Sequence, residues 1–539
     1  MFYVGAGKMV LSINPFDATI RHWSMPDCGE EIVGFRLAEA RDGSVYLTTY
    51  PSCLLLRLNP RTGETETLTR LDGTQKYGFS LACGEDGWVY AGIGTEKHNV
   101  VAYHPGTNQF ISFVPESERR RGTGQVYLAV DGNVYGSWRE DNDGVPVWMR
   151  LTKGAAAPAE TPPPASVTTG TGFQAIHGSL PFPFVIESCN LAEREIIIFN
   201  AETGQRKLIR LAYESDGANL SPITRGPDGR IYGTSNHPLQ LYAYDPATDN
   251  VINYGGRAIE RGDGGNICAY AAQGPILAGA VYAGGHLHLI DTSRPFSCAK
   301  DAQIRNPRLV ASHPEVHRPR CALAHADGEH ILYGGFPGYG AVGGGLGIYN
   351  IVTGADEVIP NDRLVPDQST LALTQLPDGR IIGGTSIETP GGAEPKATVA
   401  ELYLFDWSER KAVKRWIPVP GAREISHLKA YSTRTVAGIT NDSFLFSFDI
   451  EKEVIHRAID LSPLGTVVRD GLLLTDEGEL IGALSGGLFK VDLHSFTLSG
   501  VWRAPHPITA GLAYQDGRVY YGTGSELCSI HVKYFSFTS

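Results

Sequence analysis

An Asp-Gly step followed by a short run of β-branched and aromatic residues recurs along the whole chain. The step stands at Asp42, Asp86, Asp131, Asp228, Asp327, Asp378, Asp476 (as Asp-Glu-Gly) and Asp516. The successive intervals are 44, 45, 97, 99, 51, 98 and 40 residues, so each long interval spans about two short ones. A self-similar period of about 40–50 residues is typical of a solenoid, a propeller or another repeat array.

One repeat contains four short segments with strand character. In residues 218–253 these segments are LSPITRG, RIYGTS, LQLYAYD and NVINYG, with turn residues such as PDG and PATD between them. Short strands joined by tight turns favour an antiparallel meander, and four-stranded units at this period are typical of propeller blades. The sequence therefore predicts an all-β protein, a β-propeller with about 11–12 four-stranded blades. We expect blades to start near residues 30, 75, 122, 172, 218, 263, 316, 366, 423, 465 and 508.

The number of blades indicates more than one ring. Because a single ring usually holds about 4–8 blades, we expect two propeller rings, with one unusually large ring as the alternative. The repeat pattern is weakest over residues 295–315, which are polar and irregular. We therefore predict an N-terminal propeller over residues 1–312 and a C-terminal propeller over residues 313–539. The first 27 residues resemble the last strands of a blade, so C-terminal strands could instead complete that blade and place both termini in one ring.

The acidic balance of the chain argues against nucleic acid as a partner. The 46 Lys and Arg residues face 58 Asp and Glu residues, which gives a formal net charge of −12, and no long basic run is present. No apolar run reaches the roughly 18 residues of a membrane-spanning helix, so a membrane is not an expected partner either. The N-terminus shows no signal-peptide pattern, which fits either a secreted mature form or a cytoplasmic protein. The eight cysteines contain no CxxC pair, and we expect free thiols, with one or two disulfides as the alternative for an extracellular protein.

A propeller brings two kinds of position to one face, which we call the candidate face. These positions are the residues just before the first strand of each blade and the turn between its second and third strands, whereas the Asp-Gly turns lie opposite. Polar, cationic and His residues recur there although the chain is acidic, and such a lining suits an anionic small ligand or sugar acid. The candidate binding residues are Lys76, Arg139, Arg318, Arg320, Asp367, Gln368 and Lys396, and the candidate catalytic residues are His237, His317, Tyr339 and His427.

Two turns on the candidate face are unusual. Residues 336–350 (FPGYGAVGGGLGIYN) place six glycines around Tyr339, and residues 385–406 form a long insertion between a second and a third strand. Glycine lets the backbone approach a ligand closely, and long loops on a rigid scaffold commonly carry function. We expect both loops to belong to the site.

The sequence gives no sign of a cofactor. The stretch EDNDG at residues 140–144 is similar to a calcium loop, but Arg139 and Arg150 would occupy two of the ligand positions, so calcium is unsupported. GAVGGGLG has no βαβ unit around it and is not a dinucleotide fingerprint. His286 and His288 share one face of a predicted strand, where a metal pair is less expected than an ordinary strand pair.

Three stretches within residues 316–420 resemble one group of proteins. The stretches are HRPRCALAHADGEHILYGGFPGYGAVGGGLGIYN, VPDQSTLALTQLPDGRIIGGTS, and AELYLFDW followed by IPVPGA. They are similar to large propeller proteins of carbohydrate-degrading bacteria and fungi. More loosely, the chain resembles propeller polysaccharide lyases, including those that cut rhamnose from glucuronic acid. The resemblance implies a lyase that acts by β-elimination on a glucuronate-containing glycan such as rhamnose-capped arabinogalactan.

The chemistry of that reaction can be matched to the candidate residues. A lyase removes the proton α to a uronate carboxylate and expels the group at C4, which needs a base such as His or Tyr. Cationic groups must also stabilise the charge that grows on the carboxylate. Position and chemistry make His237, His317, His427 and Tyr339 the candidates for proton transfer, and Arg318, Arg320 and Lys396 the candidates for the carboxylate.

Two other functions fit the same sequence. A non-catalytic propeller that binds a ligand or a protein would show exposed apolar patches on its rim. A metal-dependent hydrolase of the lactonase type would need a cluster of carboxylates along the channel, for which Asp367, Glu424 and Asp470 are the evident contributors.

Overall fold

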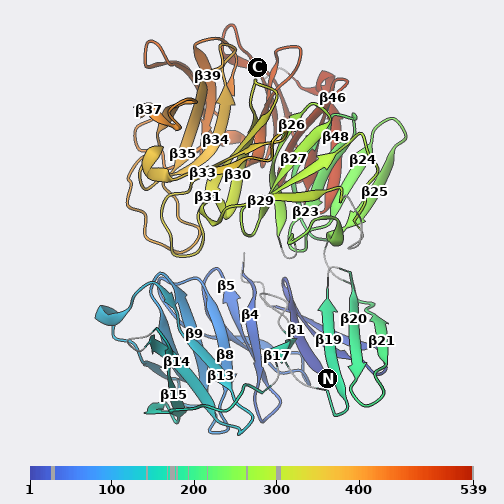
Figure 1. The fold of residues 1–539 in the computed structure, drawn as a ribbon, viewed down its shortest axis with the longest axis vertical. Helices are drawn as coiled ribbons and strands as arrows, with labels where there is room; N and C mark the ends of the chain where they lie inside the picture. Colours follow the sequence, from blue (N-terminus) through green and yellow to red (C-terminus); the bar gives the residue numbers. More distant parts are fainter. Residues whose placement is uncertain are drawn as a thin grey trace. The chain divides into compact units, whose positions relative to one another are not determined.

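The computed structural model of the chain consists of strands, short 3-10 turns and loops (Figure 1). It describes residues 1–25, 31–140, 144–166, 168–169, 176–177, 180–191, 193–214, 217–262, 265–298 and 305–536. The strands of the described residues form twelve small antiparallel sheets. The protein is therefore all-β with the repeated sheets of a β-propeller, as the sequence predicts. The described 3-10 turns are η1 (Glu116–Glu118), η3 (Gly256–Ala258), η4 (Pro314–Val316), η5 (Asn361–Arg363), η6 (Ser462–Leu464) and η7 (Val532–Tyr534).

The chain divides into two compact units, unit 1 (Met1–Ser215) and unit 2 (Asp216–Ser539). Unit 1 contains five of the sheets. Their strands are β17 (Thr168–Thr169), β18 (Ile176–His177), β1 (Phe2–Ala6), β2 (Met9–Asn14) and β3 (Thr19–Ser24); β4 (Ile32–Glu39), β5 (Val45–Tyr50), β6 (Leu54–Leu58) and β7 (Thr65–Arg70); β8 (Gly78–Cys83), β9 (Val89–Thr95), β10 (Asn99–His104), β11 (Gln109–Ser112) and β12 (Gly122–Thr123); β13 (Gln125–Leu128), β14 (Val134–Glu140), β15 (Pro146–Thr152) and β16 (Ala155–Pro158); and β19 (Phe184–Asn190), β20 (Glu195–Asn200) and β21 (Arg206–Arg210).

Hydrophobic clusters join the sheets of unit 1 in series. The sheet of β19–β21 packs on that of β1–β3, for example through Ile196 and Leu11, and the two are neighbours in Figure 1. Further clusters join β1–β3 to β4–β7, β4–β7 to β8–β11, and β8–β11 to β13–β16. Each apolar strand face is buried against the next sheet, which is the usual way in which small sheets form one core.

Unit 2 contains the remaining seven sheets. Their strands are β22 (Leu220–Arg225), β23 (Ile231–Ser235), β24 (Leu241–Asp245) and β25 (Asn250–Gly255); β26 (Asn266–Gln273), β27 (Ile276–Tyr282), β28 (His286–Asp291) and β29 (Arg308–Ser312); β30 (Arg318–Ala324), β31 (His330–Phe336), β32 (Leu346–Asn350) and β33 (Asp356–Ile359); β34 (Ser369–Gln375), β35 (Ile381–Ser386), β36 (Leu402–Asp406) and β37 (Lys411–Trp416); β38 (Ile425–Ala430), β39 (Thr435–Thr440), β40 (Phe444–Asp449) and β41 (Val454–Asp460); β42 (Val467–Leu474), β43 (Leu480–Leu484), β44 (Gly487–Asp492) and β45 (Thr497–Arg503); and β46 (Ala510–Gln515), β47 (Arg518–Thr523) and β48 (Glu526–His531).

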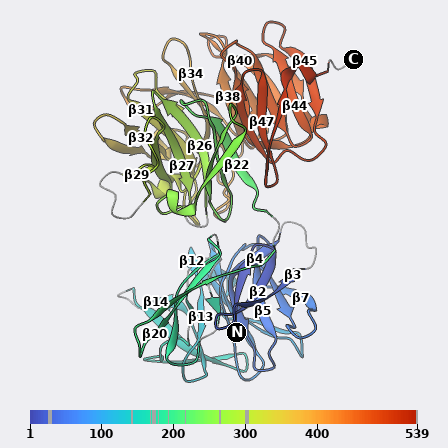
Figure 2. The same cartoon turned by 90° about the vertical axis from the view of Figure 1, so that its right-hand side faces the viewer.

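The seven sheets of unit 2 close on themselves. The first strand of each sheet contacts the first strand of the next, and β46 contacts β22. Figure 2 shows β22, in green, beside β47, in red. At this closure the Leu220 amide donates a hydrogen bond to the Gly524 carbonyl oxygen over 2.7 Å, and Ile223 packs with Tyr520. Unit 2 is thus a ring whose first and last sheets are neighbours.

The Asp-Gly steps form the tight turns that the sequence predicts. The glycine has a positive φ in each of them, for example +83° at Gly43 and +94° at Gly379. In six of the eight steps the aspartate accepts a hydrogen bond from the backbone two residues later, as Asp86 does from Trp88 over 3.1 Å. Aspartate is favoured in such turns because its side chain replaces a backbone acceptor.

A second recurring glycine lies in the second strand of the blades of unit 2. A side chain on Gly383 would lie 2.2 Å from the Tyr403 ring, and one on Gly482 would lie 2.1 Å from the Phe489 ring. In both sheets the glycine pairs directly with that aromatic residue of the third strand. The pattern IIGG or LIGA therefore reflects an aromatic ring that lies flat across the neighbouring strand.

The division into units differs from the predicted domains 1–312 and 313–539. The expected boundary falls inside unit 2, where sheets on both sides of it pack together through Leu287, Ala311, Ile331 and Tyr349. The irregular stretch 295–315 contains β29, which pairs with β28 in one sheet of unit 2. The predicted joining of both termini in one ring is also not observed, because β1 pairs with β18 and the C-terminal strands contact β22.

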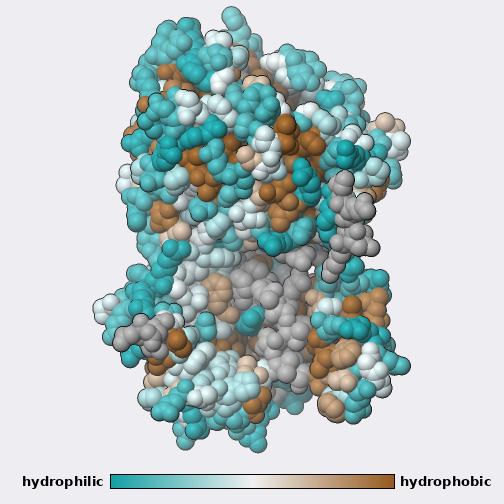
Figure 3. Space-filling model, viewed as in Figure 1, coloured by the Kyte–Doolittle hydropathy of each residue, from teal (hydrophilic) through white to brown (hydrophobic). Residues whose placement is uncertain are grey.

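The surface in Figure 3 is mainly hydrophilic, and its hydrophobic residues form separate patches in both units. The seven described cysteines are free, and Cys53, Cys83, Cys268 and Cys321 are buried; Cys28 lies outside the described residues. Within the described part of the chain, no helix has the length and apolar character needed to cross a membrane.

Candidate functional site

The strand pairing places the predicted positions of unit 2 on one face, as expected. Arg318, the first residue of β30, pairs with Phe336, the last residue of β31, and Ser369 of β34 pairs with Ser386 of β35 in the same way. The residues that lead into a first strand therefore adjoin the turn after the second strand. This is the candidate face of unit 2.

Four aromatic side chains of the candidate face contact one another around Tyr282. We call His237, Tyr282, His317 and Tyr339 the His–Tyr cluster. The rings of His237 and His317 lie edge-on to the Tyr282 ring, with centroids 5.6 Å and 5.7 Å away. The Tyr282 and Tyr339 hydroxyl oxygens are 3.5 Å apart, and the His317 and Tyr339 ring centroids are 5.5 Å apart. Three predicted residues thus meet at a tyrosine that the prediction did not include.

Three connections and the end of one strand supply the cluster. His237 lies in the turn between β23 and β24, Tyr282 ends β27, and Tyr339 lies in the loop between β31 and β32. His317 follows η4, whose path requires glycine at position 285, because a side chain there would lie 2.1 Å from the His313 carbonyl oxygen. The Tyr-Ala-Gly-Gly turn therefore lets the segment before β30 approach β27 and brings His317 to Tyr282.

Arg318 places a buried positive charge beside the two tyrosines. Its side chain is only 5% exposed, and its guanidinium carbon lies 4.5 Å from the Tyr339 ring centroid and 5.5 Å from that of Tyr282. Nη1 donates a hydrogen bond to the Pro337 carbonyl oxygen over 3.3 Å. Nη2 is buried and has no hydrogen-bond partner among the described residues. An arginine with an unmet buried donor is suited to an anionic group of a ligand, since guanidinium binds carboxylates in this way.

His317 is held in its neutral form. Burial lowers its pKa to about 4, with smaller contributions from the Arg318 cation and His286. The ring is therefore neutral at pH 7. Its Nε2 is buried and has no hydrogen-bond partner among the described residues, so this nitrogen is available to a ligand that enters the cluster.

The two unusual loops lie against each other. The Gly340 amide donates a hydrogen bond to the Gly391 carbonyl oxygen over 3.0 Å, and a side chain on Gly391 would lie 2.9 Å from the Gly338 carbonyl oxygen. The Gly344 amide donates to the Ser369 hydroxyl over 2.9 Å. The glycines thus permit close backbone contact that fixes the loop carrying Tyr339, in addition to any approach of a ligand.

Arg320 lies at a β-bulge of the first strand, two residues beyond Arg318. The register between β30 and β31 shifts between Pro319 and Cys321, and a bulge turns a side chain away from the regular alternation. The Arg320 guanidinium donates to the Pro319 carbonyl oxygen over 2.9 Å. Burial, together with the nearby Arg469 cation, lowers its pKa to about 10. Arg320 is therefore a second, half-buried cation of unit 2.

The structure gives several predicted binding residues contacts within the scaffold. Lys396 forms an ion pair with Asp367 over 3.7 Å, between two well-exposed side chains. Gln368 is buried and donates hydrogen bonds to Val399 and Glu401 over 3.1 Å and 3.2 Å. These contacts attach the insertion 385–406 to the start of β34, so they hold that loop in place.

His427 and Asp470 lie at the first strands β38 and β42. His427 Nε2 is 2.9 Å from the Val468 carbonyl oxygen, and burial lowers the His427 pKa to about 4. Burial raises the pKa of Asp470 to about 6. His427 Nε2 also lies 3.3 Å from the Gly471 amide nitrogen, so both contacts of this nitrogen are made to the neighbouring blade.

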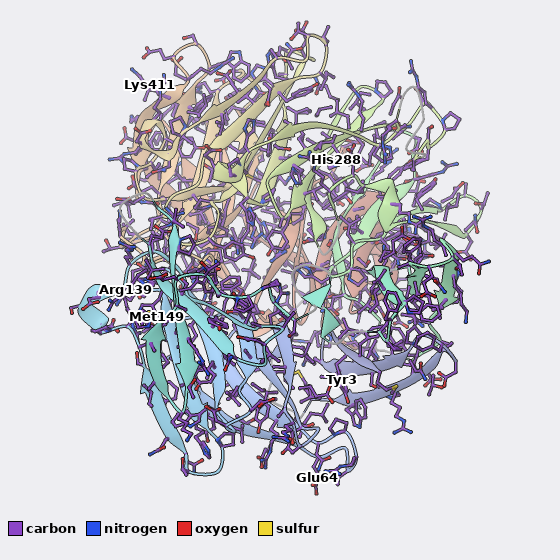
Figure 4. All side chains as sticks on the ribbon, turned by 60° about the horizontal axis from the view of Figure 1, so that its bottom comes forward. Tyr3, Glu64, Arg139, Met149, His288 and Lys411 are labelled. Carbon is purple, nitrogen blue, oxygen red and sulfur yellow. The ribbon has the colours of Figure 1, made fainter. Side chains whose placement is uncertain are left out.

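The remaining predicted residues, Arg139 and Lys76, belong to unit 1. Arg139, labelled in Figure 4, ends the regular part of β14 and lies 3.8 Å from Glu118 in an exposed ion pair. Lys76 is half-buried and precedes β8. The structure does not place unit 1 relative to unit 2, so these two residues are described only within unit 1.

The predicted histidine pair on β28 makes protein contacts. His286 Nδ1 lies 2.7 Å from the Ser312 hydroxyl, and His288, labelled in Figure 4, is fully buried with Nε2 2.8 Å from the Glu260 carbonyl oxygen. Among the described residues, no group of three or more His, Cys, Asp or Glu side chains is arranged to hold a metal ion.

The repeated small antiparallel sheets define the class of this protein as a β-propeller. No known family and no curated protein matches the chain. Among solved structures, the chain is similar to the WD40 β-propeller domain of Doa1, with a TM-score of 0.40 and 10% sequence identity over 59% of this chain and 93% of that chain.

Proposed function

We propose that unit 2 is a polysaccharide lyase whose site is the His–Tyr cluster with Arg318. Its substrate would be a glucuronate-containing glycan such as rhamnose-capped arabinogalactan, cut by β-elimination. The supporting observation is the buried Arg318 with an unpartnered Nη2, beside His317 and two tyrosine hydroxyls. These are a carboxylate-binding cation, a neutral base and proton donors in one place.

Each group has one role in the proposed reaction. Arg318 binds the uronate carboxylate and stabilises the charge that grows there as the adjacent proton leaves. His317 Nε2, which is neutral because its pKa is lowered to about 4, takes the proton from C5. The C5–H electrons form the C4–C5 double bond while the bond from C4 to the leaving oxygen breaks. That oxygen takes a proton from a tyrosine hydroxyl of the Tyr282–Tyr339 pair, and the proton held by His317 then returns through water to the tyrosinate.

The rival function is a propeller that binds an anionic sugar without cutting it. Arg318 would bind the carboxylate in the same way, and the histidines and tyrosines would supply hydrogen bonds and ring contacts. The two functions share the ligand class and differ in whether C5 loses its proton. An assay that detects the double bond therefore separates them.

The test is ultraviolet absorbance of the unsaturated uronate during incubation with a panel of uronate polysaccharides, including rhamnose-capped arabinogalactan. We expect absorbance to rise with the wild-type protein and Arg318→Met to reduce the rate by about a hundredfold or more. His317→Gln should have a loss of similar size. The matched control is His494→Ala, which changes an exposed histidine in the turn between β44 and β45. A flat trace with folded wild-type protein would show that the site is not a lyase, and calorimetric binding of the same polysaccharide would then favour the rival function.

A further inference from the structure

Three aromatic rings form a stack in unit 1, at positions equivalent to the candidate face of unit 2. The Tyr50 and Tyr77 ring centroids are 4.8 Å apart and the Tyr77 and Phe79 centroids 5.2 Å apart, each pair inclined by 23°. Tyr50 ends β5, Tyr77 immediately precedes β8, and Phe79 lies where the β8–β9 register shifts between Gly78 and Ser80. We call Tyr50, Tyr77 and Phe79 the aromatic stack.

The stack exposes part of its area. Tyr77, the middle ring, is only 4% exposed, whereas Tyr50 and Phe79 are half-buried. Tyr50 and Phe79 are not members of the hydrophobic clusters that join the sheets of unit 1. The outer rings therefore contribute to the face of the unit more than to its core.

A polar segment leads into the stack. The Gln75 side-chain oxygen accepts hydrogen bonds from the amides of Thr95 and Glu96 over 2.9 Å and 3.2 Å, which ties the turn between β9 and β10 to the residues before β8. Glu96 Oε2 is buried and has no hydrogen-bond partner among the described residues. Lys76 stands between Gln75 and Tyr77. The turn that carries Glu96 is thus held against the segment that leads to Lys76 and Tyr77.

We propose that the aromatic stack is a second, non-catalytic binding site for a neutral pyranose residue. The C–H face of a pyranose packs on an aromatic ring, because its polarised hydrogens meet the negative face of the ring. Its hydroxyl groups would donate to Glu96, which supplies the partner that the buried oxygen lacks. The site does not require the lyase reaction and uses other residues. It would bind an uncharged sugar unit of a glycan, whereas the His–Tyr cluster would bind a uronate unit.

The experiment uses the full-length protein with β-1,3-linked galactotetraose and cellotetraose as probes, measured by isothermal titration calorimetry. We expect at least one probe to bind the wild-type protein and Tyr50→Ala to weaken that binding by about fivefold to tenfold. Glu96→Gln, which keeps the size of the side chain and removes its charge, should weaken it as well. Tyr534→Ala, at a tyrosine that is 62% exposed in unit 2, is the matched control and should bind like the wild type.

The result also separates this site from the lyase site. Arg318→Met should retain the binding of the neutral probe even if no polysaccharide is ever cut. Thermal unfolding of each variant checks that the fold is retained. If Tyr50→Ala does not fold, Glu96→Gln tests the proposal in its place. The proposal is wrong if neither probe binds, if both stack variants bind like the wild type, or if the probe is lost with Arg318→Met and kept with Tyr50→Ala.

Discussion

Unit 1 and unit 2 use the same antiparallel blades but present different chemistry at equivalent positions. The position at the end of a second strand holds Tyr50 in unit 1 and, in the cluster of unit 2, Tyr282. In unit 1 this tyrosine stacks flat on a second tyrosine, whereas in unit 2 it meets histidine edges and lies near a buried guanidinium. Since the strands around both residues are alike, the turns and the residues before the first strands determine what each face can bind.

The packing of the two units differs in how the first and last sheets meet. In unit 2 the last sheet contacts the first through backbone and core, at Leu220–Gly524 and Ile223–Tyr520. In unit 1 the N-terminal strand β1 is joined by β18, a strand from residues that follow three other sheets. Each unit therefore has its own core, and we expect each to unfold as its own cooperative transition.

The largest expected effect is the loss of stability when a core side chain of one unit is truncated. Phe489 is fully buried in unit 2 and packs with Leu480 and Val501, so Phe489→Ala should lower the stability of unit 2 by about 3–5 kcal/mol. Leu11→Ala, at a fully buried residue of unit 1, should lower the stability of unit 1 by about 2–5 kcal/mol. Denaturant unfolding followed by circular dichroism should show two transitions, each moved by one variant only. If both variants move a single common transition, the two units unfold together.

A smaller effect should appear with pH in unit 2. Burial lowers the pKa of His288 to about 4 from the ordinary histidine value of 6.5, so the unfolded chain takes up this proton before the folded one as the pH falls. The contribution of His288 is therefore present above pH 6.5 and is lost as the pH falls through about 4, a change of about 3 kcal/mol. Unfolding measured between pH 7 and pH 4 should show this loss, and His288→Phe should reduce it. The exposed-site variant His494→Ala should keep the wild-type pH dependence, and an unchanged dependence in His288→Phe would contradict the assignment.

Local sequence patterns could predict the blades because each blade is built from nearby residues. Ten of the eleven predicted starts precede the observed first strand by two or three residues, for example 465 against Val467. The start near 172 precedes β19 by 12 residues, in a region without an Asp-Gly step. The packing of neighbouring blades, such as Leu287 with Ile331, gives no local sequence pattern. The sequence therefore did not show that the predicted boundary at 312/313 lies inside one unit.

The sequence could predict which positions share a face but not which side chains bind one another. Position alone brought together His237, His317, Arg318 and Tyr339. Tyr282 was missed, although it follows an apolar strand and precedes Ala-Gly-Gly, the same position that Tyr50 holds in its blade. Gln368 and His427 were chosen by the same kind of position, but their hydrogen bonds to Val399 and Val468 depend on strand register that no composition reveals.

The smallest expected effect concerns Lys396, which contrasts an exposed cation with the buried Arg318. The Lys396 and Asp367 side chains are 66% and 44% exposed, and an ion pair of this kind contributes between about 0 and 1 kcal/mol because water and salt screen it. Lys396→Ala should therefore change the unfolding free energy by less than about 1 kcal/mol. In the ultraviolet assay we expect its rate to stay close to that of the wild type, because a solvated ammonium binds a carboxylate weakly compared with a desolvated guanidinium. A loss as large as that of Arg318→Met would mean that the insertion 385–406 brings Lys396 to the substrate, and that the carboxylate site extends over two blades of unit 2.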